Sequence, residues 1–520
     1  MSVNIRVNSA ADEADRRRVA VSRQLDWERR ADLGQYLTPV GVARFMAGMF
    51  DELPTRVALL DAGAGTGTLT AAFVEQACRS VTCPAEICAT TYEVDAPMLE
   101  HLEETLKDCA AICEEAGVAF QGDIRTADFI EAATASLGGG LFRDKSLSFD
   151  AAILNPPYRK IATFSMERCL LQTVGLDATN MYAAFVALAI RLLRPNGQMA
   201  VIMPRSFCNG PYFRPFRELL LSEMTIRRVH VFESRKKAFR DDAVLQENII
   251  LHAVKAKPAG GVIRLSTGDS DAEPKLRDVD YSEVVREANG DRFIHLPTDQ
   301  SDSDTAGWMA ALPMTLPSLG IEVSTGRVVD FRAREFLRVD PGPDTVPLIY
   351  PCHFSSGVVE WPLSPCRKPN AISDVPESLS LMVPSGYYVL TKRFSSKEER
   401  RRVVAAVYDP SVFPFHRVGF ENHVNYFHAR GAGLDRDTAF GLMVFLNSTP
   451  VDRYFRQFNG HTQVNATDLR TLRYPDLESL AALGRAAVEG RTDCQEKLDE
   501  VVVATCQATT KNGDPTASAG

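Results

Sequence analysis

Short apolar runs alternate with longer segments of helical periodicity through the first half of the chain. The short runs predict buried strands, and apolar residues spaced three or four apart predict amphipathic helices. Such alternation predicts an α/β fold with a doubly wound, mostly parallel sheet. The expected strands are 57–60, 87–92, 118–121, 151–154, 197–204, 226–232 and 247–254, and the expected helices are 68–78, 97–116 and 180–193.

The pattern changes after residue 255. Turn-rich polar segments predict a linker, and alternating stretches with prolines and aromatic residues then predict a second, α+β domain. The last residues are small and polar, which predicts disorder. The expected regions are a helical extension, an α/β domain, a linker, a C-terminal domain and a helical tail with a disordered end, at 1–33, 34–255, 256–312, 313–475 and 476–520.

Polar residues follow the ends of four expected strands. Ligands of parallel sheets bind outside the carboxyl ends of the strands, so these side chains are expected to converge at one edge. Taken singly, Glu93 and Asp123 could equally be N-caps of the helices that follow them. The four residues are Asp61, Glu93, Asp123 and Asn155.

Two features at that edge, a glycine-rich turn and an acidic residue, suit the binding of a nucleoside. The turn at 61–67 has Gly-x-Gly-x-Gly spacing, which is tighter than in dinucleotide-binding loops and lets the backbone approach a small charged group. Glu93 ends the second strand, where ribose hydroxyls bind in such folds. Asp123 can accept a hydrogen bond from a purine amino group, and Ile124 can pack on the purine face.

The turn Asn155-Pro156-Pro157-Tyr158 is the most distinctive feature of the chain. Two prolines restrict its backbone, so three groups are held in one direction. Asn155 offers a side-chain carbonyl, Pro156 a backbone carbonyl and Tyr158 a flat ring. Two neutral acceptors beside an aromatic face suit a planar substrate with an amino group, although a bare strand end with a proline turn would look the same.

Composition narrows the class of protein. Because 45% of the residues are hydrophobic and 24% are charged, the chain is expected to be globular. No stretch approaches the roughly 18 apolar residues of a membrane span, and the N-terminus lacks an apolar signal core, so a cytoplasmic location without membrane contact is expected. The eleven cysteines include no Cys-x-x-Cys pair, so neither disulfides nor a metal site is expected.

The formal net charge of −9 argues against sequence-blind coating of nucleic acid but leaves room for a local basic groove. In the second domain, basic residues are interleaved with aromatic rings, as in Lys392-Arg393-Phe394. Such a cluster could also be a solvated face. A further helix is expected after Gly34-Gln35-Tyr36-Leu37-Thr38-Pro39, with Thr38 as the N-cap, and its positive end could hold a carboxylate.

The order of these motifs resembles the Type II adenine-specific DNA methyltransferases of the gamma group, whose cofactor is S-adenosylmethionine. The matching motifs are GQYLTP, DAGAGTG, YEVD (92–95), GDI (122–124), NPPY, PRSF (204–207) and AFRDDAVLQENIIL (238–251). The second domain is similar to modification methylases of the BsuBI/PstI type. That similarity lies in TGRVVDFR (325–332), KRFSSKEERRR (392–402) and NGHTQVNATDLRTLRYP (459–475).

The resemblance assigns roles to matching positions. It implies that Asn155, Pro156, Pro157 and Tyr158 receive the target adenine, and that Phe239, or else Phe232, packs on the flipped base. The cofactor residues that it implies are Tyr36, Thr38, Asp61, Gly63, Gly65, Glu93, Asp123, Ile124 and Asn155. The implied DNA-binding residues are Lys392, Arg393, Lys397, His461, Thr462, Gln463 and Asn465. Many gamma members have Glu-Pro where this chain has Asp61-Ala62, so the carboxylate is kept but its reach is shorter.

These residues predict methyl transfer to the 6-amino group of an extruded adenine in double-stranded DNA, as the modification half of a restriction–modification system. We expect Asn155 and Pro156 to hold the two amino hydrogens, so that no strong general base is required. A protein glutamine or RNA adenine methyltransferase could use the same turn, and a catalytically inactive DNA-binding module is a further alternative. Cleavage is expected in a separately encoded endonuclease. The oligomeric state stays open, and so does the target sequence, for which the resemblance would allow CTGCAG.

Overall fold

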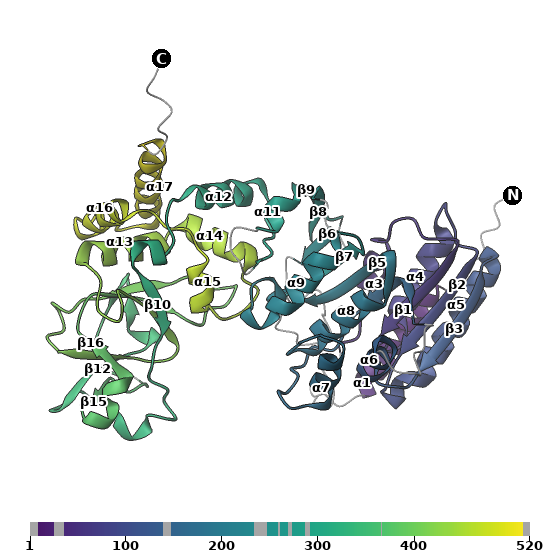
Figure 1. The fold of residues 1–520 in the computed structure, drawn as a ribbon, viewed down its shortest axis with the longest axis horizontal. Helices are drawn as coiled ribbons and strands as arrows, with labels where there is room; N and C mark the ends of the chain where they lie inside the picture. Colours follow the sequence, from purple (N-terminus) through teal and green to yellow (C-terminus); the bar gives the residue numbers. More distant parts are fainter. Residues whose placement is uncertain are drawn as a thin grey trace, which may run out of the picture. The chain divides into compact units, whose positions relative to one another are not determined.

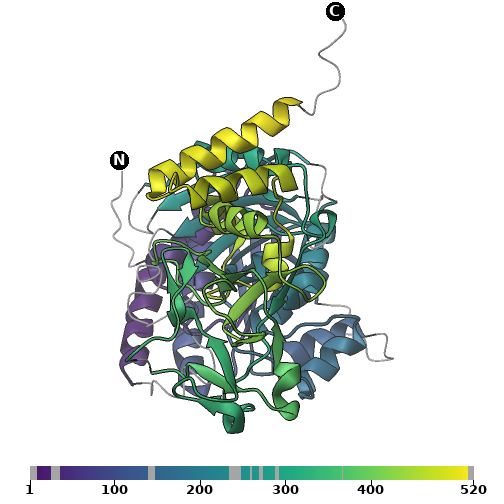
Figure 2. The same ribbon diagram turned by 90° about the vertical axis from the view of Figure 1, so that its left-hand side faces the viewer.

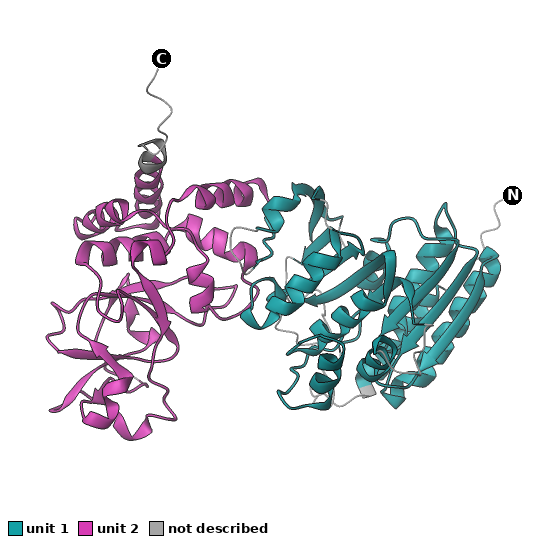
Figure 3. Ribbon diagram, viewed as in Figure 1, with its two compact units in different colours: residues 1–298 teal, residues 299–520 magenta. Residues whose placement is uncertain are grey.

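The chain forms two compact units, residues 1–298 and residues 299–520 (Figure 3). A computed structural model describes residues 9–24, 36–138, 147–232, 247–257, 260–268, 273–286, 292–365 and 367–512. No helix among these residues is both long and apolar enough to cross a membrane.

The first unit is built on one large sheet (Figure 1). Over the described residues its strand order is β3-β2-β1-β4-β5-β7-β6-β8-β9. Strands β7 and β9 run antiparallel to their neighbours, and the other strands are mutually parallel, which confirms the mostly parallel α/β sheet. The bounds are β1 Arg56–Ala62, β2 Glu86–Tyr92, β3 Ala119–Arg125, β4 Phe149–Leu154, β5 Leu193–Pro204, β6 Thr225–Phe232, β7 Asn248–Val254, β8 Val262–Gly268 and β9 Lys275–Asp280.

Helices cover both faces of this sheet because its central strands are apolar on both sides. Successive strand side chains point to opposite faces, so Leu59 and Ile153 enter one core while Leu60 and Leu154 enter the other. Helices α1, α3, α4 and α5 pack on the first face, and α6, α8 and α9 pack on the second. The bounds are α1 Ala10–Gln24, α3 Val40–Ala47, α4 Thr68–Arg79, α5 Ala96–Ala116, α6 Phe129–Leu137, α7 Met166–Thr173, α8 Met181–Leu192, α9 Arg214–Glu223 and α11 Tyr281–Val284.

Two regions differ from the sequence-based expectation. The connector after β3 contains helix α6, which Asp128 caps by accepting from the backbone N–H of Ile130. The expected linker supplies β8 and β9, and the two units divide at residues 298 and 299. These strands were missed because they bury few side chains, mainly Ile263 and Leu265 of β8 and Val279 of β9.

The second unit combines two sheets with helices, as expected for an α+β domain. The sheet orders are β10-β20-β17-β18-β14-β13 and β11-β15-β12-β19-β16 over the described residues. Aromatic side chains of the first sheet and its neighbours form a buried cluster that includes Tyr388, Tyr408, Phe420 and Tyr426. The bounds are β10 Glu322–Thr325, β11 Leu337–Arg338, β12 Thr345–Ile349, β13 Phe354–Ser355, β14 Val358–Val359, β15 Ala371–Ser373, β16 Met382–Pro384, β17 Tyr388–Lys392, β18 Ala405–Tyr408, β19 Arg417–Phe420 and β20 Val424–His428.

Helix α13 contacts β17 and β18 of the six-stranded sheet and also packs on α16. Helix α17 packs on α16 in turn, and the helices at the C-terminal end of the chain lie together in yellow in Figure 2. The helix bounds in the second unit are α12 Gln300–Ala311, α13 Arg436–Leu446, α14 Thr449–Phe458, α15 Ala466–Arg470, α16 Leu477–Val488 and α17 Gln495–Asn512. Short 3-10 helices in the chain are η1 Arg205–Cys208, η2 Pro211–Phe213, η3 Pro317–Leu319, η4 Arg334–Phe336, η5 Pro351–His353 and η6 Pro376–Leu381.

Glycines allow the backbones of α13 and α16 to touch. A Cβ atom on Gly441 would lie 1.7 Å from the carbonyl oxygen of Leu480, and one on Gly484 would lie 1.9 Å from that of Asp437. Both obstacles are backbone atoms, so the helices would have to separate to admit a methyl group.

Gly441→Ala is therefore expected to destabilise the second unit by about 1–3 kcal/mol, since overpacking outweighs the better helix propensity of alanine. The matched control is Gly307→Ala in α12, where an added Cβ meets no atom within 4 Å. Urea unfolding can be followed by the fluorescence of Trp308, whose ring lies 6.4 Å from that of Phe445 in α13. Equal midpoints for the two variants would contradict the close helix contact.

Candidate active site

A cleft opens at the carboxyl ends of β1, β2 and β4 and encloses about 800 Å³, including its mouth. It lies at the sheet edge where ligands bind in doubly wound folds. Its lining residues are Tyr36, Leu37, Gly63, Gly65, Tyr92, Glu93, Val94, Ala127, Asp128, Phe129, Asn155, Pro157, Arg159, Met181 and Phe185.

The glycine turn between β1 and α4 forms one wall. Gly63, Gly65 and Gly67 all have positive φ, which favours glycine at each position. A Cβ on Gly65 would lie 2.9 Å from a methyl carbon of Leu37, so the turn also needs glycine for space. The backbone N–H groups of Gly63 and Ala64 donate to the carbonyl of Tyr92, which ties the turn to the end of β2.

Glu93 connects the same two elements through its side chain. One carboxylate oxygen accepts from the backbone N–H of Gly65 at 2.8 Å, and the other accepts from Val94 and Asp95 at 2.9 and 2.8 Å. Burial raises the pKa of Glu93, while these backbone hydrogen bonds act in the opposite direction. Glu93 therefore lines the cleft and also fixes the glycine turn.

Asp61 lies fully buried near the end of β1. One carboxylate oxygen accepts from the Thr70 hydroxyl at 2.7 Å, and the other has no hydrogen-bond partner among the described residues. Burial raises the pKa of Asp61 to about 7, the Thr70 hydrogen bond lowers it, and the charge of Glu93 raises it further. A cation nearby would favour the ionised carboxylate.

Asn155 follows β4 and binds the segment before α3. Its amide nitrogen donates to the Tyr36 carbonyl at 2.5 Å and to the Thr38 hydroxyl at 2.9 Å. Its amide oxygen accepts from the Tyr158 hydroxyl at 3.1 Å. The expectation that Thr38 caps α3 is wrong, because Pro39 is the N-cap and the Thr38 hydroxyl faces Asn155 instead.

The Tyr158 ring is enclosed, with 8% of the residue exposed. Its centroid lies 5.4 Å from that of Tyr36, and Tyr182 approaches it edge-on at 6.2 Å. Burial raises the pKa of Tyr158 well above its ordinary value, so the phenol stays protonated and can donate to Asn155. The same hydroxyl lies 3.3 Å from the Ile202 carbonyl.

Two of the expected cofactor residues lie inside β3 and do not line this cleft. Asp123 is half exposed and accepts from Arg125 at 2.9 Å, and Ile124 packs on the small core formed by Ala64, Leu102 and Leu106. Part of the cleft is lined instead by residues that the sequence analysis did not select, among them Tyr92, Asp128 and Phe129. The helix-capping position of Asp128 is the signal that could have revealed them.

Of the two aromatic residues expected to pack on the flipped base, the structure describes one. Phe239 lies outside the described residues. Phe232 ends β6, is buried in the core on the α3 side of the sheet, and contacts His230 edge-on at 4.7 Å.

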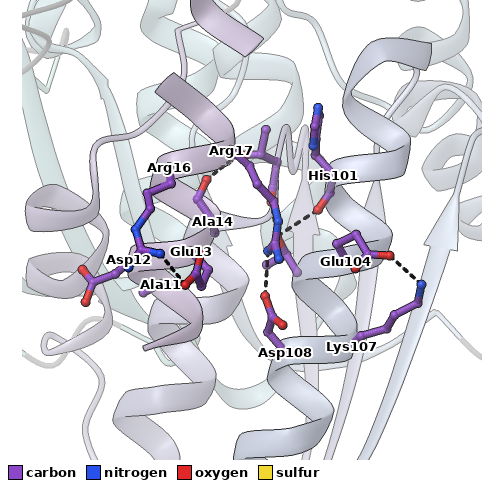
Figure 4. A network of polar contacts seen from close by, with 12 residues as sticks. Ala11, Asp12, Glu13, Ala14, Arg16, Arg17, His101, Glu104, Lys107 and Asp108 are labelled. Carbon is purple, nitrogen blue, oxygen red and sulfur yellow. Dashed lines mark hydrogen bonds and ion pairs between the residues drawn. The ribbon is translucent and has the colours of Figure 1, made fainter. Parts of the chain in front are cut away.

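Helix α1 supports the glycine turn by way of α5, and Figure 4 shows Arg17 of α1 facing Asp108 of α5. Arg17 donates to the Thr105 hydroxyl at 3.1 Å and pairs with Asp108 at 2.7 Å. Thr105 in turn donates to the carbonyl of Thr66 at 2.8 Å. Asp15 of α1 accepts from the backbone N–H of Val40 at the start of α3, so this helix holds both segments that border the cleft.

The expected DNA-binding residues of the second unit come from two segments that lie side by side. Ser395 donates from its backbone to the Thr462 carbonyl at 3.0 Å, and Val464 donates to the Arg393 carbonyl at 2.8 Å. Residues 392–397 and 461–465 therefore share one surface, although residues 398–460 separate them in the chain. No group of three potential metal ligands occurs among the described residues.

This strand order, with a glycine turn, an acidic residue after β2 and an NPPY turn at one sheet edge, defines the class of α/β methyltransferases. The Eco57I restriction-modification methylase family matches residues 69–239. Type II methyltransferase M.PstI of Providencia stuartii is 45% identical over 96% of this chain and 97% of its own length. Type II methyltransferase M.BsuBI of Bacillus subtilis is 42% identical over 95% of this chain and 98% of its own. The chain therefore belongs to the Type II methyltransferases of restriction–modification systems.

Asp61 gives the site a pH dependence that stability measurements can detect. In the unfolded chain the carboxyl ionises near its ordinary pKa of 3.8, whereas in the folded chain its pKa is about 7. The folded state thus retains a proton between these values, and stability is lost as pH rises through that window. Asp61→Asn should remove this loss, so its stability relative to wild type should rise by up to about 4 kcal/mol between pH 4 and 8.

Urea unfolding of both proteins across this pH range checks the Asp61 prediction. Thr70→Val is the control of opposite sign, because it removes the hydroxyl that donates to the carboxylate. It should become less stable than wild type as pH rises. A constant difference between Asp61→Asn and wild type at all pH values would contradict the assignment.

Proposed function

We propose that this protein transfers a methyl group from S-adenosylmethionine to the 6-amino group of adenine in double-stranded DNA. The observation that carries the proposal is the fixed amide of Asn155, whose oxygen lies on the side away from Tyr36 and Thr38. The names of the relatives support DNA as the substrate over protein or RNA, since the resemblance runs along 96% of the chain.

The residues present fit a nucleoside cofactor with a charged amino-acid moiety. Gly63 and Gly65 leave the turn open to backbone approach, and Glu93 lies in the cleft where ribose hydroxyls would bind. Asp61 holds an oxygen without a partner among the described residues beneath this turn, and the positive charge of the cofactor would stabilise its ionised form. When bound, the sulfonium supplies an electrophilic methyl group.

Asn155 and Pro156 position the adenine amino group for that methyl group. The amide oxygen of Asn155 already accepts from Tyr158 and retains a second lone pair for one amino hydrogen. No backbone N–H among the described residues donates to the Pro156 carbonyl, which can take the other hydrogen. Holding both hydrogens would leave the nitrogen lone pair free to face the methyl group, so transfer would depend on positioning rather than on a strong base. The N–C bond would form as the S–C bond of the sulfonium breaks, and one amino proton would then pass to water.

Target entry requires a rearrangement around Tyr158. Only 8% of this residue is exposed, so the groups that cover the ring must move aside before a purine can stack on it. Extruding a base from the duplex costs a few kcal/mol, and aromatic stacking offsets part of that cost. Within a restriction–modification system, the resulting methyl group would protect a site from a separately encoded endonuclease.

Long-read sequencing of DNA from cells that express the protein tests this proposal. The expected result is methyladenine in nearly every copy of one short sequence, and none in cells that express no such protein. Unmodified DNA, or modified cytosine alone, would overturn the proposal.

Asn155→Ala should abolish methyl transfer, by about 10³-fold or more, because it removes an acceptor that orients the amino group. Cofactor affinity should fall far less than the rate, since Glu93 and the glycine turn keep their mutual contacts even though the amide nitrogen that holds Tyr36 and Thr38 is also lost. Single-turnover methylation and equilibrium cofactor binding measure the two effects separately. Methylation at the wild-type rate would rule out this mechanism.

Tyr158→Phe and Tyr158→Ala separate the hydroxyl from the ring. The phenylalanine variant loses the hydrogen bond to the Asn155 oxygen but keeps the stacking face, so methylation should slow by about tenfold, equivalent to roughly 1.4 kcal/mol. The alanine variant should weaken binding of target duplex more than binding of cofactor. Equal kcat and equal duplex affinity in the two variants would contradict a stacking role for the Tyr158 ring.

A further inference from the structure

Three loops of the second unit meet at one surface, and the sequence analysis selected two of them. The third contains His423, between β19 and β20. The backbone N–H of Arg393 donates to the His423 carbonyl at 2.8 Å, and the Arg393 guanidinium donates to the Asn422 carbonyl at 3.1 Å. Because Val464 also donates to the Arg393 carbonyl, residue 393 joins all three loops.

Glu421 fixes the orientation of the His423 ring. This carboxylate is 1% exposed, and it accepts from the His423 backbone N–H at 2.9 Å while it pairs with the ring Nδ1 at 2.5 Å. The ring nitrogen on the other side, Nε2, has no hydrogen-bond partner among the described residues. The His423 side chain is nevertheless 48% exposed, so a buried acid holds a surface imidazole in one direction.

Phe394 packs on this imidazole from the neighbouring loop. The two ring centroids lie 5.0 Å apart, and Phe394 is 42% exposed. An apolar ring on the surface beside an oriented hydrogen-bonding group offers both kinds of contact that distinguish base edges in the major groove. Cations for phosphate groups lie close by along the chain, at Lys392 and Lys397, and neither is fully buried.

We propose that His423, oriented by Glu421 and supported by Phe394, reads one base pair of the target sequence. The inference rests on the proposed function and assigns it a specificity-determining group. The Nε2 atom hydrogen-bonds a base edge, as an acceptor in the neutral imidazole or as a donor in the charged one. The exposed face of Phe394 contacts the neighbouring base, and Glu421 is a positioning residue that does not touch DNA.

The test uses the full-length protein and its variants His423→Ala, Phe394→Ala and Glu421→Gln. Two readouts are needed: the set of sequences methylated in cells, and the affinity for the cognate duplex against duplexes with single base-pair changes. His423→Ala should lose about 5- to 150-fold of discrimination at one position, the equivalent of one base contact. Phe394→Ala should relax the adjacent position, and Glu421→Gln should weaken the same position as His423→Ala, but less.

His416→Ala is the matched control. His416 is also an exposed histidine of the second unit, 70% exposed, and its Nε2 lies 2.7 Å from an oxygen of Asp374. This substitution should leave the methylated sequences unchanged. His423→Gln, which keeps a polar side chain, is the second variant should His423→Ala fail to fold, as judged by its unfolding temperature.

The outcomes separate this inference from the proposed function. If the wild type methylates adenine at one sequence and both His423 variants discriminate every position as the wild type does, the inference fails and the function stands. Equal weakening on all duplexes would identify a phosphate contact and would also overturn it. If the wild type methylates no DNA, the function and the inference both fail.

Discussion

The site depends first on how one amide is held. Asn155 uses both hydrogens of its amide nitrogen on oxygen acceptors, the Tyr36 carbonyl and the Thr38 hydroxyl, which lie 119 and 117 residues away in the chain. Rotating the amide by half a turn would place an oxygen against the Tyr36 carbonyl, which cannot donate a hydrogen bond, so this orientation is unfavourable. The oxygen must therefore face Tyr158 and the substrate side. A single pair of hydrogen bonds thus joins the N-terminal segment to the NPPY turn and sets the direction of the Asn155 amide oxygen.

Two buried acids form the electrostatic part of the same site. Glu93 offsets its burial with three backbone N–H groups, whereas Asp61 has the Thr70 hydroxyl on one oxygen only. Burial raises the pKa of both carboxyls, and the charge of Glu93 adds to the effect on Asp61. When one of these two carboxyls is ionised, ionising the other becomes less favourable, and a positive charge beside the turn becomes more favourable. A cationic cofactor would relieve this cost.

Residues with strong local signals were predictable from the sequence. Strands β1, β2 and β4 and the NPPY turn follow from apolar runs that end in glycine, acid or proline, and Asp61, Glu93 and Asn155 meet near one edge as expected. The expected strand 118–121 ends too early, because β3 continues through Asp123 and Ile124 to Arg125. Strand β9 was missed because an edge strand needs few buried side chains, and its single buried residue, Val279, gives no pattern. The wall near Phe129 was missed because its position depends on a helix cap and on packing between elements, which no single segment encodes.

Basic clusters show why charge in the sequence does not map directly onto a binding surface. Arg402, the last of three consecutive arginines, is 1% exposed. It donates to the hydroxyl of Ser395, the amide oxygen of Asn459 and the carbonyl of His461. A guanidinium offers five donors in one plane, so it can satisfy several acceptors on separate loops at once. Here it holds the loops at 395 and 461 together. The positive charge thereby stabilises the surface on which neighbouring residues would contact DNA, and buried carboxylates such as Asp452, which accepts from the Arg402 backbone N–H, fix it further.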